Sequence, residues 1–307
     1  MSPRSFPPFF LIGYLCVLGK SLLYTVAAGM ILLIISTGHS SSLPGSRTDS
    51  PSCKEIIDKT LASIDNVKTL QYHLNISERI GPKTFHTESI VKLNRKPRKI
   101  YMNLKGPEVL WVEGKNNGNA LVNPNGFPYI NLNLDPMGSI LRENQHHTIN
   151  EIGFDYYASI VRSSIKFAGP KFDVYFKLNG EITWNKRACY SVTADYPEFK
   201  YVDYTVKKGE DLIKIARTLC VSEFMVQEAN NDKVSDYYDV SEGQVIKVPI
   251  LYGKKTELLI DKQYMLPINT KVYDGKGLFE SYEYDILLVD PPLKDEEFTK
   301  GYKDYHF

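Results

Sequence analysis

Two adjacent histidines, His146 and His147, are the most chemically suggestive residues in this sequence. A pair of histidines can bind a metal ion or relay protons. Side chains of neighbouring residues diverge, however, and no third metal ligand lies at helical or strand spacing from this pair. We therefore expect capping or solvated histidines here, and no metal site.

The sequence also contains no recognisable set of the catalytic side chains that common hydrolytic enzymes use. Such enzymes use a nucleophilic cysteine beside a histidine, a metal ion held by paired histidines, or two well-placed carboxylates. None of these arrangements stands out in the 307 residues. The sequence predicts no catalytic residue and no cofactor, and hence a protein that is not an enzyme.

Cysteine usage adds no reactive site. Cys16 lies in an apolar run, which leaves Cys53, Cys189 and Cys220 in the rest of the chain and allows one disulfide at most. No CxxC pair occurs, so a zinc site or a thioredoxin-like motif is not expected. Buried thiols are the favoured interpretation.

The N-terminal region indicates export. Two apolar runs separated by Lys20 precede a serine-rich stretch. Either the second run is the core of a signal sequence cleaved near His39, or the segment is an uncleaved anchor with Arg4 on the cytoplasmic side. We expect a signal sequence or membrane anchor over residues 1–38, with the membrane as a partner of this N-terminal segment, and a flexible linker over residues 39–51.

The overall composition is that of a globular protein without a strong electrostatic field. Lysine and arginine number 37 against 36 aspartate and glutamate, and 43% of residues are hydrophobic. This balance offers no attraction to nucleic acid, so no nucleic-acid partner is expected. The chain is long enough to bury one large core or two smaller ones.

Apolar spacing then predicts an α+β fold with one antiparallel sheet and two packed helices. Ser52 and Glu55 have capping-box spacing at the start of one helix, and Thr148 and Glu151 have it at the start of the other. Between and after them, apolar residues alternate as in half-buried strands. Two such sets are Tyr72, Leu74, Ile76 and Ile80, and Tyr282, Tyr284, Ile286 and Leu288.

A segment over residues 202–250 departs from this pattern, with helical spacing between two short strands. It resembles a LysM module, a small βααβ domain, through these residues: Tyr204, Val206, Gly209, Leu212, Ile215, Ala216, Val221, Asn230, Gly243, Gln244, Ile246 and Pro249. A βααβ unit has its ends close together, so we expect an insert in a host domain, with few core contacts crossing the boundary.

The LysM resemblance implies a site for N-acetylglucosamine glycans such as peptidoglycan. It lies in a groove between the turn after the first strand and the loop after the second helix. The residues concerned are Gly209, Glu210, Asp211, Leu212, Asn230, Asn231, Asp232 and Lys233. LysM modules usually have Gly-Asp-Thr or Gly-Asp-Ser where this chain has Gly209-Glu210-Asp211. This departure bears on the affinity for glycan more than on the βααβ fold.

The host, over residues 52–201 and 251–307, resembles the LolA-like lipoprotein-carrier half-barrel. More narrowly, "RKIYMNL", "GNALVNP", "LNLDPMGSILRENQHHTINEIGF" and Cys189 are similar to an uncharacterised bacterial envelope family, domain of unknown function fifteen-seventy-one. The resemblance implies a curved antiparallel sheet and an apolar ligand cavity. Alternation alone does not distinguish a hollow barrel from a packed one.

Together these features predict a non-enzymatic protein of the bacterial periplasm or cell envelope. It would bind peptidoglycan through LysM and hold or pass a lipid or lipoprotein in the half-barrel. Two alternatives stay open: a cell-wall enzyme with an unrecognised site, and a structural interaction module whose LysM no longer binds sugar.

Overall fold

The computed structural model describes residues 50–307. The predicted signal sequence or anchor over residues 1–38, and nearly all of the predicted linker over residues 39–51, lie outside the described residues. Within residues 50–307, no helix has the length and apolar composition needed to cross a bilayer. Cys53, Cys189 and Cys220 are free thiols, and the first two are buried, as predicted.

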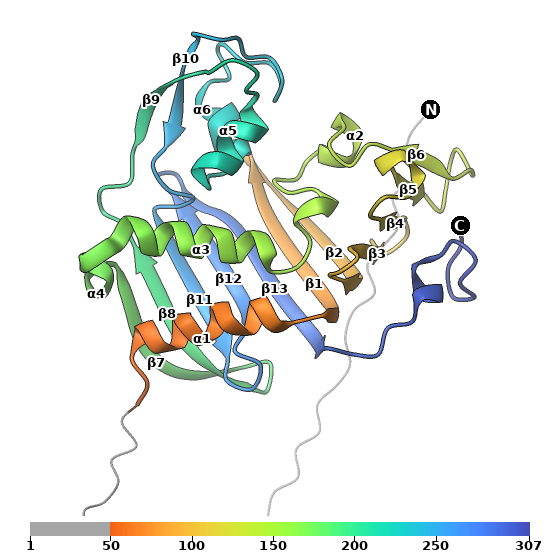
Figure 1. Cartoon of the computed structure of the whole chain (residues 1–307), viewed down its shortest axis with the longest axis horizontal. Helices are drawn as coiled ribbons and strands as arrows, with labels where there is room; N and C mark the ends of the chain where they lie inside the picture. The colour runs from red at the N-terminus through yellow and green to blue at the C-terminus, as the bar shows by residue number, and fades with distance from the viewer. Residues whose placement is uncertain (1–49) are drawn as a thin grey trace, which may run out of the picture. The chain divides into compact units, whose positions relative to one another are not determined.

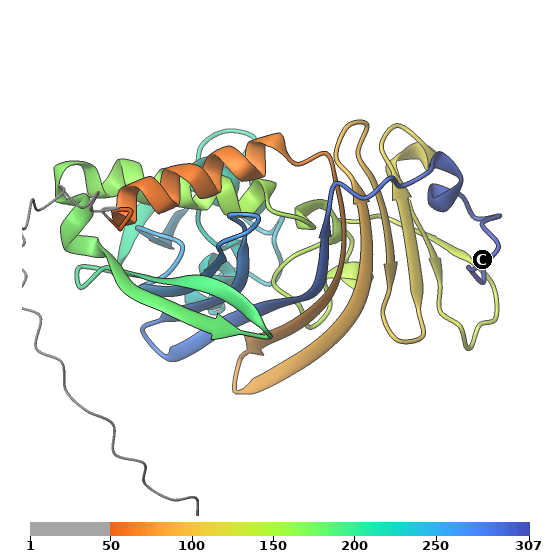
Figure 2. The same ribbon diagram turned by 90° about the horizontal axis from the view of Figure 1, so that it is seen from below.

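The main element of the described chain is one antiparallel sheet of 11 strands (Figure 1). Its strand order is β6-β5-β4-β3-β2-β1-β13-β12-β11-β8-β7. The sheet is strongly curved (Figure 2), which confirms the predicted α+β class with a curved antiparallel sheet. The strands are β1 (Thr69–Ile80), β2 (Lys83–Asn94), β3 (Lys99–Asn103), β4 (Glu108–Val112), β5 (Ala120–Asn123), β6 (Leu132–Leu134), β7 (Phe176–Trp184), β8 (Arg187–Asp195), β11 (Lys255–Asp261), β12 (Pro267–Asp274) and β13 (Gly277–Val289).

Two longer helices, α1 (Cys53–Asn66) and α3 (Asp155–Ala168), lie side by side across one face of this sheet (Figure 1). The predicted capping box opens α1, because the Ser52 hydroxyl accepts from the Glu55 N–H and the Glu55 carboxylate accepts from the Ser52 N–H. Shorter turns complete the host: α2 (Ser139–Arg142), α4 (Phe172–Tyr175), η1 (Asn116–Gly118), η2 (Ile149–Glu151), η3 (Gly169–Lys171) and η4 (Asp295–Phe298).

The second predicted helix begins later than its capping box indicates. Thr148 and Glu151 do form that box, but they cap only the 3₁₀ turn η2. Gly153 follows with φ +95°, a conformation that a helix cannot continue through. A Cβ at Gly153 would lie 2.6 Å from a methyl carbon of Leu93, so this glycine also permits close packing on the sheet. Helix α3 therefore starts at Asp155.

Near the end of β13, the side chains point to the opposite faces of the sheet from those predicted. Ile286 was expected to point inward with Tyr282 and Tyr284, but it is 78% exposed while Leu287 is buried. Ile286 has φ +49°, and the register between β13 and β1 shifts at this point. This β-bulge adds one residue, and one residue moves every later side chain to the other face.

The predicted βααβ unit is present and consists of β9 (Tyr201–Thr205), α5 (Leu212–Leu219), α6 (Glu223–Ala229) and β10 (Val245–Pro249). Strands β9 and β10 pair with each other in a separate two-stranded sheet. The unit has its own apolar core of Val206, Leu212, Ile215, Ala216, Val221, Val226, Val234, Ile246 and Val248.

This unit lies in the chain between β8 and β11, which pair with each other in the host sheet. Its two ends meet, since the Ile250 N–H donates to the Lys200 carbonyl at 3.1 Å. Core contacts nevertheless cross the boundary: Met225 of α6 is fully buried in a cluster with Tyr252, Val272 and Phe279 of the host. Whether the host folds without residues 202–250 stays a prediction.

Candidate functional site

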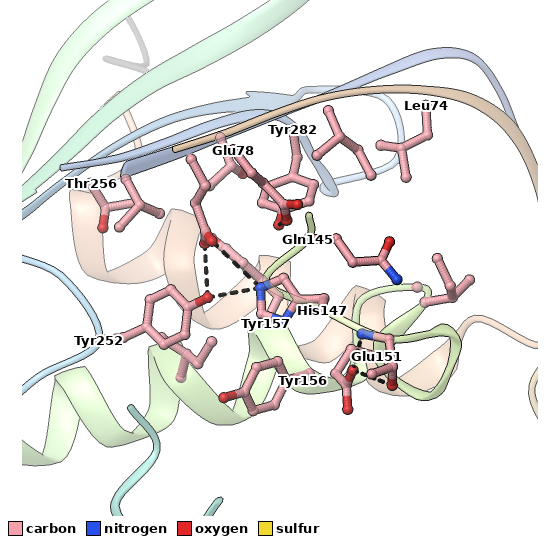
Figure 3. Close-up of a pocket in the computed structure, with 18 of the residues that line it drawn as sticks. Leu74, Glu78, Gln145, His147, Glu151, Tyr156, Tyr157, Tyr252, Thr256 and Tyr282 are labelled. Carbon is pink, nitrogen blue, oxygen red and sulfur yellow. Dashed lines mark hydrogen bonds and ion pairs between the residues drawn. The ribbon is translucent and has the colours of Figure 1, made fainter. Parts of the chain in front are cut away.

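A cavity of about 180 Å³ lies between the concave face of the sheet and helix α3 (Figure 3). A single water needs only about 10–15 Å³ on this kind of measure, so the space is much larger than a packing defect. Its wall is mainly apolar and includes Leu74, Ile76, Met102, Val109, Ile160, Val161, Ala194, Leu258 and Val272. The half-barrel is hollow here, which strand alternation alone could not decide.

Polar side chains gather at one part of the cavity wall. Glu78 comes from β1, Glu280 from β13, and His147 from the segment before η2. The Tyr252 hydroxyl donates to Glu280 Oε1 at 2.9 Å and lies 2.8 Å from His147 Nε2 (Figure 3). The Tyr282 hydroxyl donates to the Glu78 carboxylate. We call these five residues the polar cluster.

His146 supports the polar cluster from behind. Its backbone N–H donates to Glu78 Oε2 at 3.0 Å, and its Nδ1 lies 2.8 Å from Glu280 Oε2. The His146 side chain is fully buried, and its ring stacks on Phe279. The prediction of capping or solvated histidines is therefore wrong. The two rings meet at the same carboxylate, because His146 Nδ1 lies 2.8 Å and His147 Nε2 lies 3.6 Å from Glu280 Oε2. The expectation that these neighbouring side chains diverge is therefore wrong.

The His147–Glu280 pair is charged at neutral pH. Burial lowers the pKa of His147, but the hydrogen bond and charge of Glu280, with the charges of Glu78 and Glu151, outweigh it and raise that pKa to about 9. Burial raises the pKa of Glu280, but hydrogen bonds from His146 and His147 and their charges lower it to about 2. Burial is also the main reason that the pKa values of Tyr252 and Tyr282 lie far above the usual range.

The polar cluster also contains the atoms best placed to hold a metal ion. One ligand atom each from Glu78, His147 and Glu280 lie within 4.8 Å of one another. Imidazole and carboxylate are donors that transition metals accept, and a tyrosine hydroxyl orients each carboxylate. The Glu280 carboxylate already pairs with both histidines, and Glu78 accepts from His146 and Tyr282, whereas His147 Nδ1 has no hydrogen-bond partner among residues 50–307. The absence of a metal remains a prediction.

Sequence reasoning missed both glutamates, although strand periodicity carried a signal. Glu78 has the same parity in β1 as Leu74 and Ile76, which face the cavity. Glu280 has the same parity in β13 as Tyr282. A carboxylate at an inward strand position needs a partner, and this requirement points to a buried polar site.

The residues predicted to bind glycan fall into two kinds. Gly209, Asn231, Asp232 and Lys233 are exposed, and Gly209 forms its turn with φ +75°. Leu212 and Asn230 are buried, and their side chains serve the LysM core: the Asn230 amide donates to the carbonyls of Val226 and Lys247, while Leu212 is fully enclosed. The side chains of these two residues are not available to a sugar.

The two acidic residues of the predicted site are held by local contacts. Glu210 accepts from the Tyr204 hydroxyl and from the Lys207 N–H. Asp211 is the N-cap of α5 and accepts from the Lys214 N–H at 2.8 Å. The first turn of α5 also meets the loop between α6 and β10, because the Leu212 N–H donates to the Tyr237 carbonyl at 2.9 Å.

Comparison with known proteins agrees with both resemblances. Residues 67–214 match the family model described as "Protein of unknown function (DUF1571)", and residues 204–249 match that of the LysM domain. A search of curated proteins found no match.

Several solved structures are similar to this chain in outline. They include the Pseudomonas aeruginosa MucA/MucB complex (10% identity, TM-score 0.37, 81% of this chain and 61% of that one). The Mycobacterium tuberculosis lipoprotein LppX gives 10% identity and a TM-score of 0.36 over 79% of this chain and 97% of that one. A LolA-superfamily protein from Nitrosomonas europaea gives 10% identity and a TM-score of 0.31 over 82% of this chain and all of that one. Likenesses of this size carry no functional conclusion.

Residues 67–214 are thus similar to the DUF1571 family, and a LysM domain follows over residues 204–249.

Proposed function

We propose that this protein is a non-enzymatic component of the bacterial cell envelope that binds peptidoglycan, or a related N-acetylglucosamine glycan, and holds a lipid chain. The LysM domain supports the first role, and it also supports a location outside the cytoplasm. The cavity in the half-barrel supports the second.

The cavity is the observation that carries the lipid role. Its apolar wall favours a hydrocarbon over water, since burial of apolar surface yields about 25 cal/mol per Å². The polar cluster lies in the same wall and offers hydroxyl, imidazole and carboxylate groups to the polar end of a ligand. An amphiphile with one acyl chain fits this combination better than a polar metabolite does.

A fluorescent fatty acid tests the lipid role. Ala194 lines the cavity from β8, so Ala194→Phe should fill it and abolish binding. Ala188→Phe is the matched control, because Ala188 lies on the same strand but is exposed. Binding by wild type and by Ala188→Phe, and its loss in Ala194→Phe, is expected. Equal binding by all three would contradict the cavity as the site.

Co-sedimentation of the full chain with insoluble peptidoglycan tests the glycan role. Wild type should enter the pellet. Its affinity for the glycan should be weak, because each hydrogen bond to the sugar contributes only about 0.5–1.5 kcal/mol. A protein that stays in the supernatant would contradict this role and favour the structural interaction module. Turnover of purified muropeptides would instead show a cell-wall enzyme.

A further inference from the structure

A second cleft, of about 310 Å³, lies between the host and the LysM domain. It is separate in position from the predicted sugar-binding turn at Gly209, which does not line it. The host contributes Ser139, Arg142 and Asn144 to its lining, and the LysM domain contributes Gln227, Tyr237 and Tyr238.

Arg142 gives this cleft a set of unsatisfied hydrogen-bond donors. The side chain is only 5% exposed, and its guanidinium lies over the Tyr237 ring at 3.9 Å. One nitrogen donates to the buried Glu223 carboxylate at 3.1 Å. Its Nε and Nη1 have no hydrogen-bond partner among residues 50–307. Buried donors without acceptors are unfavourable, so this cleft is suited to a ligand that brings acceptor oxygens.

The other lining residues add the chemistry that sugars require. Tyr238 is 56% exposed and offers an aromatic face to the apolar side of a sugar ring. The Asn144 amide can donate to and accept from hydroxyl groups, and the Gln227 amide, whose Nε2 donates to the Ser235 carbonyl at 3.2 Å, offers its oxygen as an acceptor. Ser139 and Asp236 supply further polar groups from opposite walls.

The aromatic loop is also held in place before any ligand arrives. The Tyr238 N–H donates to the Asp236 carboxylate at 2.7 Å, and both the N–H and the hydroxyl of Ser235 donate to Asp239. The Tyr237 carbonyl accepts from the Leu212 N–H at 2.9 Å, which joins this loop to the turn expected to bind glycan. Preorganisation of this kind lowers the entropic cost of binding.

From these observations we infer that the host domain and the LysM domain together form a composite saccharide site. An N-acetylated hexosamine stacks on Tyr238, its acetamido carbonyl accepts from Arg142, and its hydroxyls meet Gln227 and Asn144. The inference rests on the glycan-binding role proposed above and adds to it a wall that an isolated LysM domain lacks.

Titration of the full chain with a soluble N-acetylglucosamine oligomer tests this inference. Tyr238→Ala removes the stacking face from the LysM side, and Ser139→Trp obstructs the cleft from the host side. Both positions are exposed, so folding should be preserved, and thermal unfolding checks that it is. Tyr129→Ala is the matched control, since Tyr129 is 81% exposed and does not line the cleft.

Each cleft variant should weaken oligomer binding by about three- to tenfold, the size expected for one lost stacking contact, while the control binds like wild type. If wild type binds and both cleft variants bind equally well, the composite site is overturned and the glycan-binding role stands. If wild type binds neither the oligomer nor peptidoglycan, both the composite site and the glycan-binding role are overturned.

Discussion

Glu280 is the residue that organises the polar end of the cavity. It is buried, and it pairs with His146, His147 and Tyr252. A buried carboxylate without such partners would be strongly unfavourable. The adjacent histidines are therefore best understood as two supports of one carboxylate from β13.

The stability of the protein should depend on pH through His147. Its pKa is raised to about 9 in the folded state, so the stabilisation it contributes is complete below about pH 6.5 and is lost as the pH rises through about 9. The contribution of Glu280 has the opposite dependence, because its lowered pKa makes it complete above about pH 4.5 and lost toward pH 2. We expect the melting temperature of wild type to fall between pH 7 and pH 10.

His147→Gln should reduce that fall in melting temperature, because glutamine does not titrate. The exposed His86 provides the control variant His86→Gln, which should keep the wild-type slope. Melting temperatures of the three proteins at pH 7 and pH 10 are compared, with roughly 2–4 °C expected per kcal/mol lost. A His147→Gln slope identical to that of wild type would show that the pair does not stabilise the fold.

Gly209 should be required for the glycan-binding turn. Its φ of +75° disfavours a β-branched residue by about 1–2 kcal/mol, although a Cβ there would meet no atom within 4 Å. Gly209→Val should therefore weaken peptidoglycan binding by distorting the turn. Gly209→Asn is the control, since asparagine tolerates positive φ. Wild-type binding by Gly209→Val would mean that the turn does not contact glycan.

At the scale of elements, the sequence predicted which helices and strands exist better than where they begin or change face. The capping boxes at Ser52 and Thr148 both form, and the alternation in β1 holds. The sequence did not predict the start of α3, because the backbone conformation of Gly153 goes with its close packing against Leu93, which is distant in the sequence. The sequence did not predict the bulge at Ile286, because an alternating pattern of apolar residues does not indicate where a strand contains an extra residue.

Helix α6 should stabilise the host as well as the LysM domain. Met225 is fully buried against Tyr252 and Phe279, so Met225→Ala should cost about 2–5 kcal/mol. Both tryptophans, Trp111 and Trp184, belong to the host, so their fluorescence reports on host unfolding alone.

The denaturation midpoint of the tryptophan signal should shift in Met225→Ala. The control Val245→Ala alters a half-exposed LysM side chain and should leave the midpoint nearly unchanged. An unshifted host midpoint in Met225→Ala would show that the two domains unfold independently.

At the scale of the whole molecule, the family resemblances implied a curved sheet, an apolar cavity and an inserted LysM domain, but strand alternation established neither the cavity nor the packing of Met225 at the boundary. Inward alternation is the same in a hollow and a filled barrel, so the space beside Ala194 and Leu258 depends on how α3 lies over the sheet. The burial of Met225 likewise depends on the placement of the insert against Phe279. Both are long-range effects that no local pattern records.

We propose that one molecule binds glycan and a lipid chain at the same time. Co-sedimentation with insoluble peptidoglycan in the presence of a fluorescent fatty acid measures both at once. Wild type and Ala188→Phe should carry the fatty acid into the pellet, whereas Ala194→Phe should reach the pellet without it. A wild-type protein that pellets while the fatty acid stays in solution, or an Ala194→Phe pellet that carries as much fatty acid as wild type, would contradict the account.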